Sequence, residues 1–154
     1  MERHNYIRWR TENRLTLCRG ELALARGDGV QALALAEDAM GQASPHGATK
    51  SMHLAHDLAG RAPATLGKTE EAMIRLEQAV MGAAAIEYRA GHWRSLAHLA
   101  DVLEHAGQVA AAEDRRAAAR AVIGTIAQGM RDPDSRTAFL AATSVPAALT
   151  HPAR

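Results

Sequence analysis

Apolar and small residues recur along much of this chain at steps of three and four, the spacing of one face of an α-helix. In the first such stretch Leu15, Cys18 and Leu22 follow this spacing, and we expect them to form the buried face of a helix. Glycine-containing segments interrupt the pattern, and residues that favour strands are scarce. The pattern therefore predicts an all-α chain without strands.

The interruptions divide the chain into seven expected helices. Their ranges are 6–26, 30–43, 48–66, 69–87, 92–106, 109–129 and 134–143. Asp132 is a suitable cap and Pro133 a suitable first-turn residue for the last helix, whose Phe139 and Leu140 we expect to point inward. Residues 144–154 contain two prolines and are expected to form a flexible tail.

Pro63 lies inside the third expected helix. Proline has no N–H to donate, and its ring clashes with the carbonyl four residues earlier, here that of Ala59. We therefore expect a kink at Pro63, or a helix that ends early and restarts.

Small residues repeat with a period of forty. Gly27, Gly67 and Gly107 stand at three expected turns. Other small residues keep the same register in each copy: Gly20, Ala32 and Ala39; then Gly60, Ala72 and Ala79; then Ala100, Ala112 and Ala119. Such a period is typical of stacked supersecondary units. We predict one repeat domain over residues 1–143, with hairpins at about 6–43, 48–87 and 92–130 and a capping helix at 133–143. Within each hairpin, the alanine five residues past the turn glycine is expected to face the small residue seven before it.

These small positions resemble those of the tetratricopeptide repeat. The resemblance covers about residues 11–130 and implies a right-handed α–α superhelix of three hairpins. The chain departs from the family in its period of forty, where thirty-four is usual. It also departs at the family's aromatic positions, which here hold Thr16, His56, Leu96, Ala23, Pro63 and Leu103.

A segment near the C-terminus, residues 126–140, carries a second resemblance. It is similar to the closing segment of repeat arrays in large bacterial ATP-dependent transcriptional regulators and adenylate-cyclase-like ATPases. The resemblance implies the sensor or docking region of a bacterial signalling or transcriptional regulator.

The first resemblance also implies a binding surface, because the first helices of tetratricopeptide hairpins line a concave groove. The residues it places there are Arg14, Glu21, Asp57, Arg61, Arg94, Asp101, Glu104 and His105. Charges of both signs favour another protein or a peptide as the partner. We expect the guanidinium groups of Arg61 and Arg94 to be free to bind carboxylates of that partner. One alternative is a small inducer-like ligand in the same groove, and another is a metal-binding protein or an enzyme.

Composition narrows these possibilities. A net charge of +1 argues against a dedicated nucleic-acid or anionic-membrane protein. The N-terminal residues lack the apolar stretch of a signal peptide, and no run approaches the roughly twenty apolar residues of a membrane span. Cys18 is the only cysteine, so no internal disulfide can form. We expect a cytoplasmic protein, and its oligomeric state stays open.

Three groups of residues invite a chemical function. Residues 66–69, Leu-Gly-Lys-Thr, match the last residues of a phosphate-binding loop. That motif follows a strand, whereas a helix is expected before these residues. His53, His56 and Asp57 could meet His98, Asp101 and His105 on adjacent helices, as metal ligands do. Arg115, Arg116 and Arg120 form a basic stripe that we expect to be solvated on the outer face. We predict no catalytic residue, cofactor or metal.

Overall fold

The computed structural model describes residues 2–142 and Val145, with side chains from Arg8 onward. Within this part of the chain there are seven α-helices and no strand, as predicted. They are α1 (Glu2–Ala25), α2 (Gly29–Ala43), α3 (Thr49–Thr65), α4 (Thr69–Ala85), α5 (Arg89–His105), α6 (Val109–Gln128) and α7 (Pro133–Ala141), with a 3₁₀ turn, η1 (Ser44–His46), between α2 and α3. Apart from Val145, the expected tail at 144–154 lies outside the described residues.

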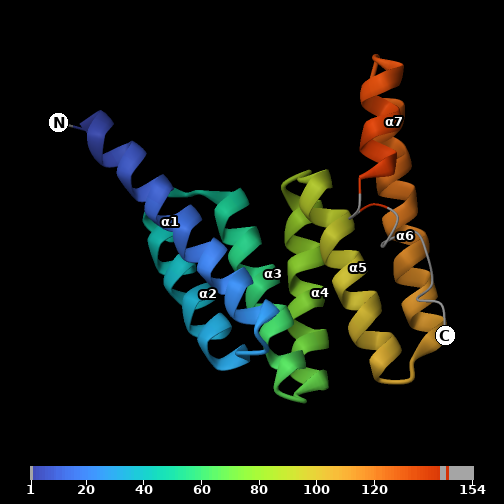
Figure 1. Cartoon of the computed structure of the whole chain (residues 1–154), viewed down its shortest axis with the longest axis horizontal. Coiled ribbons are helices and arrows are strands. Elements are labelled where there is room, and N and C mark those ends of the chain that lie inside the picture. The colour runs from blue at the N-terminus through green and yellow to red at the C-terminus, as the bar shows by residue number, and fades with distance from the viewer. Residues whose placement is uncertain (1, 143–144, 146–154) are drawn as a thin grey trace.

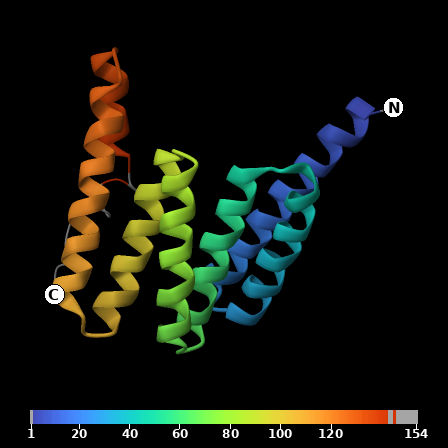
Figure 2. The same ribbon diagram turned by 180° about the vertical axis from the view of Figure 1, so that it is seen from behind.

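The helices stand side by side in chain order, with α1 and α7 at opposite ends of the row (Figure 1). Figure 2 shows the same row from behind. Each helix packs against the next, and in addition α1 contacts α3 and α3 contacts α5. Side chains from α1, α3 and α5 can therefore meet directly, although about forty residues separate them in sequence. None of the described helices is both long and apolar enough to cross a lipid bilayer.

One type of turn recurs every twenty residues. Gly27, Gly47, Gly67, Glu87 and Gly107 have φ values of 75°, 57°, 72°, 51° and 77°. After each of them, the following N–H donates to the carbonyl five residues back, with N–O distances of 2.9–3.3 Å. This arrangement satisfies carbonyls that the end of a helix leaves unpaired, and it needs one residue in the left-handed conformation. The predicted turns at 27, 67 and 107 are confirmed, and the turns at 47 and 87 divide each period of forty into equal halves.

The small residues of the forty-residue register are buried. Those that follow the turn glycines by five and by twelve residues are at most 1% exposed: Ala32, Ala72, Ala112, Ala39, Ala79 and Ala119. Gly20 lies against α3, because the atoms nearest to a Cβ added there all belong to Leu58, and its expected pairing with Ala32 stays a prediction. A Cβ at Gly60 would similarly meet Leu76 of α4, with 2.9 Å to its Cγ atom. These glycines accommodate a leucine from a neighbouring helix.

The expected buried face of α1 is also wrong. Leu15 and Leu22 are 52% and 49% exposed, and Cys18 is exposed between them. From Arg8 onward, the buried residues of α1 are Asn13, Thr16, Gly20 and Ala23. Asn13 Nδ2 donates to the carbonyl of Ala39 in α2 at 2.7 Å, which compensates for its burial.

Pro63 neither ends α3 early nor makes it restart, so that part of the expectation is wrong, whereas the expected kink stays a prediction. The helix continues through Pro63 to Thr65, and the proline is fully buried. Because Pro63 lies in the last turn, its missing N–H removes a bond only at the helix end. Its carbonyl accepts the N–H of Lys68 at 3.0 Å in the following turn.

Two further expectations about side-chain placement need correction. Gly91, which stands between the fourth and fifth expected helices, lies within α5, where a Cβ would collide with the His53 ring. Leu140 in α7 is 39% exposed, whereas Phe139 packs partly buried against the core formed by α4, α5 and α6. The short α7 therefore turns one of its two large apolar residues inward.

Glu87 is the one non-glycine residue of the recurring turn, so it gives a test of the turn. We expect Glu87→Gly to raise the free energy of unfolding by about 0.5–1 kcal/mol, because glycine adopts positive φ without steric penalty. Gly67→Ala, at the preceding turn twenty residues earlier, should lower it by about 1 kcal/mol. Urea denaturation measures both changes. A destabilised Glu87→Gly protein would contradict this account of the turn.

Candidate functional site

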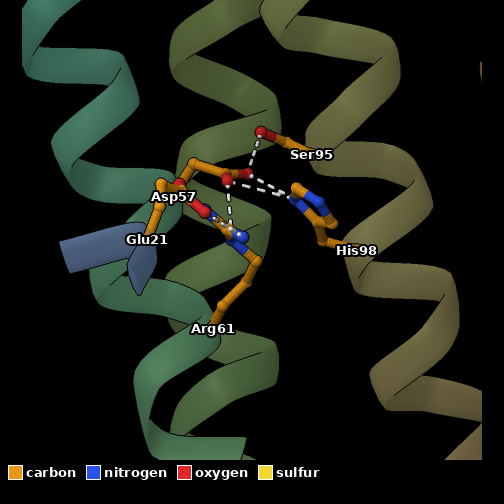
Figure 3. Close-up of polar contacts among 5 residues, drawn as sticks. All are labelled: Glu21, Asp57, Arg61, Ser95 and His98. Atoms are coloured by element: carbon orange, nitrogen blue, oxygen red, sulfur yellow. Dashed lines mark hydrogen bonds and ion pairs between the residues drawn. The ribbon is translucent and has the colours of Figure 1, made fainter. Parts of the chain in front are cut away.

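A chain of polar side chains links α1, α3 and α5 (Figure 3). Asp57 of α3, whose side chain is 8% exposed, lies at its centre. Ser95 Oγ of α5 donates to Asp57 Oδ1 at 2.5 Å, and His98 Nδ1 lies 3.0 Å from Oδ2 and 3.1 Å from Oδ1. Arg61, one turn along α3, places its Nε 3.0 Å from Asp57 Oδ2. The other end of its guanidinium group binds both carboxylate oxygens of Glu21 in α1.

The partners of Asp57 keep its carboxylate charged. Burial alone would raise the pKa of Asp57, but the opposing effects of His98, Arg61 and the Ser95 hydroxyl hold that pKa well below its usual range. Burial would likewise lower the pKa of Arg61, whereas Asp57 and Glu21 raise it. Such a network is expensive to break at Asp57, because its buried carboxylate is the group that Arg61, His98 and Ser95 all contact.

The arrangement is not that of a nucleophilic serine. Ser95 is fully buried and donates its proton to a carboxylate, not to a histidine. In a serine triad the histidine lies between the serine and the acid, whereas here Asp57 lies between Ser95 and His98. The contact with an ionised carboxylate, which only accepts, requires the His98 proton on Nδ1. The other ring nitrogen, Nε2, faces away from Asp57 (Figure 3).

An open cavity of about 330 Å³ adjoins this polar chain, between the C-terminal halves of α3 and α5. Ala64 and Val102 supply apolar surface, and the other lining residues are Arg61, Thr65, Thr69, His98, Asp101 and His105. Both the guanidinium group of Arg61 and the imidazole of His98 are held by Asp57, so the polar wall of the cavity is fixed before anything binds. The cavity can take a side chain or a small molecule of mixed apolar and polar character.

Of the eight predicted groove residues, the structure places five in the polar chain or the cavity and three in neither. Glu21, Asp57 and Arg61 meet in the polar chain, and Arg61, Asp101 and His105 line the cavity. Arg14, Arg94 and Glu104 do neither: Arg14 is exposed on α1, Arg94 lies over the Trp93 ring at 5.0 Å, and Glu104 binds Arg116. The expectation of a free guanidinium group at Arg61 is wrong, because this chain's own carboxylates occupy it.

Arg116 corrects the expected solvated stripe on α6. Its side chain is 2% exposed and reaches back to α5, with Nη2 2.5 Å from Glu104 Oε2 and 3.3 Å from Asp101 Oδ1. Arg115 pairs with Glu77 of α4 at 2.8 Å, and Arg120 pairs with Glu113. These arginines join neighbouring helices or turns of the array, and Arg116 also positions one wall of the cavity.

The remaining motifs have structural explanations. Among the described residues, no three His, Cys, Asp or Glu side chains come close enough together to hold a metal ion. His53 is buried, meets the Tyr88 ring edge-on at 5.4 Å, and has a pKa lowered mainly by burial. Gly67 belongs to the recurring turn, with α3 before it, and Lys68 lies 3.9 Å from Glu71.

Ser95 was not predicted as a member of the site, and His98 was considered only as a metal ligand. The forty-residue register contained a signal for Ser95. Its equivalents are Leu15 and Ala55, so a hydroxyl stands at a position otherwise held by an apolar residue. A buried hydroxyl needs a hydrogen-bond partner, and Asp57 is within reach on the adjacent helix.

Comparison with known proteins adds no relative: no family model, curated protein or solved structure matches this chain.

The low pKa of Asp57 predicts how stability changes with acid. A carboxyl group whose pKa is depressed on folding stabilises the protein above its unfolded-state pKa, and that stability is lost as the pH falls towards the folded-state pKa. We expect the free energy of unfolding to decrease as the pH falls below about 5. Asp57→Asn should lower it by about 3 kcal/mol at pH 7 and make its acid dependence shallower.

Urea denaturation between pH 3 and pH 7 measures both effects. Asp114→Asn, at an exposed position on α6, is the matched control and should change stability by less than about 0.5 kcal/mol. An Asp57→Asn protein that keeps the acid dependence of the unmodified chain would show that this carboxylate does not stabilise the fold.

Proposed function

We propose that this chain is a protein-binding module that holds a segment of its partner on the face formed by α1, α3 and α5. The forty-residue register and its resemblance to the tetratricopeptide repeat support this proposal, as do the direct contacts of α3 with α1 and α5. In the proposed array the first helix of each hairpin lies on the inner side of a right-handed superhelix. Stacked helical arrays present extended surfaces of this kind to their partners.

The cavity between α3 and α5 is the observation that carries the proposal. Its apolar floor suits one aliphatic side chain of a bound segment. Around that floor stand groups that can exchange hydrogen bonds with a peptide: the hydroxyls of Thr65 and Thr69, the His105 ring and the carboxylate of Asp101, whose side chain is 62% exposed. We therefore infer a partner segment with an aliphatic anchor and hydrogen-bond donors beside it.

A small ligand is the second candidate, and the size of the cavity favours it. Its volume of about 330 Å³ lies at the lower end of the range found for small-molecule sites, and its polar wall is fixed in advance. The resemblance of residues 126–140 to bacterial regulators is compatible with either candidate, since a sensor region can bind an inducer or a partner protein.

Blocking the cavity tests both candidates. Ala64 lines it and is only partly exposed, so Ala64→Phe should fill the apolar floor. Ala121→Phe places the same ring at an exposed position on α6 and is the matched control. The probes are a displayed library of helical peptides and, separately, a panel of metabolites in a thermal-shift assay.

We expect selected peptides to bind the Ala64→Phe protein at least about tenfold more weakly than the unmodified chain, a loss of about 1.4 kcal/mol. Their affinity for the Ala121→Phe protein should be unchanged. A metabolite whose thermal shift disappears only in Ala64→Phe would favour the small-ligand candidate. Peptide binding that is indifferent to Ala64→Phe would exclude this cavity as the partner site.

A further inference from the structure

The forty-residue register identifies an exposed surface on α1 whose equivalent positions on α3 are mostly buried. The surface consists of four exposed residues of α1 and the exposed residue directly after it, and we call it the α1 outer face: Leu15, Cys18, Arg19, Leu22 and Arg26. Its equivalents in α3 are Ala55, Leu58, Ala59, Ala62 and Leu66. Four of those five are buried, with exposures of 0–2% for Ala55, Leu58, Ala59 and Ala62.

The hairpin that precedes α3 buries these equivalent positions. Leu58 packs against Gly20 of α1, and with Ala59 it shares an apolar cluster with Ala36 of α2. A Cβ added to Gly29 of α2 would lie 2.7 Å from the carbonyl oxygen of Ala62 and 2.9 Å from Leu66 Cγ. This face of α3 is thus an interface for a preceding pair of helices.

The same interface recurs one period later. The equivalents of Leu15, Arg19 and Leu22 in α5 are Ser95, Leu99 and Val102, and these are 0%, 0% and 8% exposed. The equivalents of Cys18 and Arg26 are less covered: the His98 side chain is 30% exposed, and Ala106 is exposed. Leu99 belongs to a cluster that includes Leu76 and Val80 of α4. On two of the three helices in this register, α3 and α5, this face therefore packs against the pair of helices that comes before it. No described residue packs against the equivalent face of α1.

The α1 outer face differs from its equivalents in charge. Arg19 and Arg26 stand where α3 has Ala59 and Leu66 and where α5 has Leu99 and Ala106. Within the described residues, neither arginine forms an ion pair with another side chain. Burying these guanidinium groups against an apolar helix would leave them unpaired, so a partner must supply carboxylates opposite them.

We propose that the α1 outer face is a docking surface for an amphipathic helix of a partner protein whose apolar stripe is flanked by aspartate or glutamate. Leu15, Cys18 and Leu22 would pack against the stripe, as Leu58 and Ala62 pack against α1 and α2. Arg19 and Arg26 would pair with the acidic flank. A second copy of this chain fits less well, because two such faces in contact would bring four arginines together.

Cys18 makes the proposal measurable, because it is the only cysteine of the chain and lies within the α1 outer face. Its rate of alkylation by iodoacetamide on the full chain reports whether the face is occupied. The probes are two synthetic peptides built on the α2 sequence, Gly29–Ala43, since α2 packs against the equivalent face of α3. One peptide carries glutamate at its exposed positions and the other carries lysine.

We expect the glutamate peptide to slow alkylation and the lysine peptide to leave it unchanged. A Kd of about 0.1 mM gives roughly tenfold slowing at 1 mM peptide, because only unoccupied chains react. The double variant Arg19→Ala and Arg26→Ala should lose this protection. The double variant Arg89→Ala and Arg131→Ala removes the same charge from exposed positions elsewhere and should keep it.

Three outcomes would overturn the proposal: no protection by the glutamate peptide, equal protection by both peptides, or protection that survives loss of Arg19 and Arg26. Alkylation that slows with protein concentration in the absence of peptide would instead assign the face to a second copy. Ala64→Phe should not affect Cys18 protection, so this test is independent of the one for the cavity. Circular dichroism confirms that each variant is folded.

Discussion

The hydrogen bond that closes each turn, from the residue after the left-handed position to the carbonyl five residues earlier, sets the register of the whole array. It recurs after residues 27, 47, 67, 87 and 107, so the turns are spaced twenty residues apart and the helices that follow them begin at equivalent positions. Residues forty apart consequently occupy equivalent places on α1, α3 and α5. The polar chain through Glu21, Arg61 and Asp57 depends on this alignment, because α1 and α3 must present their charges at the same height.

Much of the fold could be predicted because glycine and alanine signal backbone geometry directly. Positive φ favours glycine, so Gly27 and Gly67 indicated the turns. Close helix contacts favour small residues, so alanines such as Ala72 indicated the buried positions. The turn at Glu87 was expected too late, at residues 88–91, because a residue other than glycine adopts the left-handed conformation there. The face of α1 was mistaken because periodicity shows that a helix has an apolar side but not that a neighbouring helix lies against it.

The candidate site was predictable only in part, for a related reason. The resemblance to the tetratricopeptide repeat implied that Glu21, Asp57 and Arg61 lie together on adjacent helices. Sequence could not show that their charges neutralise one another, because that depends on distances of about 3 Å between α1, α3 and α5. The placement of Arg116 was unpredictable for the same reason. Its sequence neighbours do not show whether the arginine is solvated or reaches from α6 to Glu104 of α5.

Because the turns are equally spaced, forty-residue segments could be duplicated, lost or exchanged without changing any turn. The charges that neighbouring segments present to one another limit which of these changes the fold would tolerate. The register position held by Glu21 is held by Arg61 in the second hairpin and by Asp101 in the third. Loss of residues 49–88 would keep the backbone phase, yet it would bring Glu21 opposite Asp101 and set two carboxylates against each other. The alternating signs thus keep the segment that carries Arg61 next to the segment that carries Glu21, a restriction that identical turns alone do not impose.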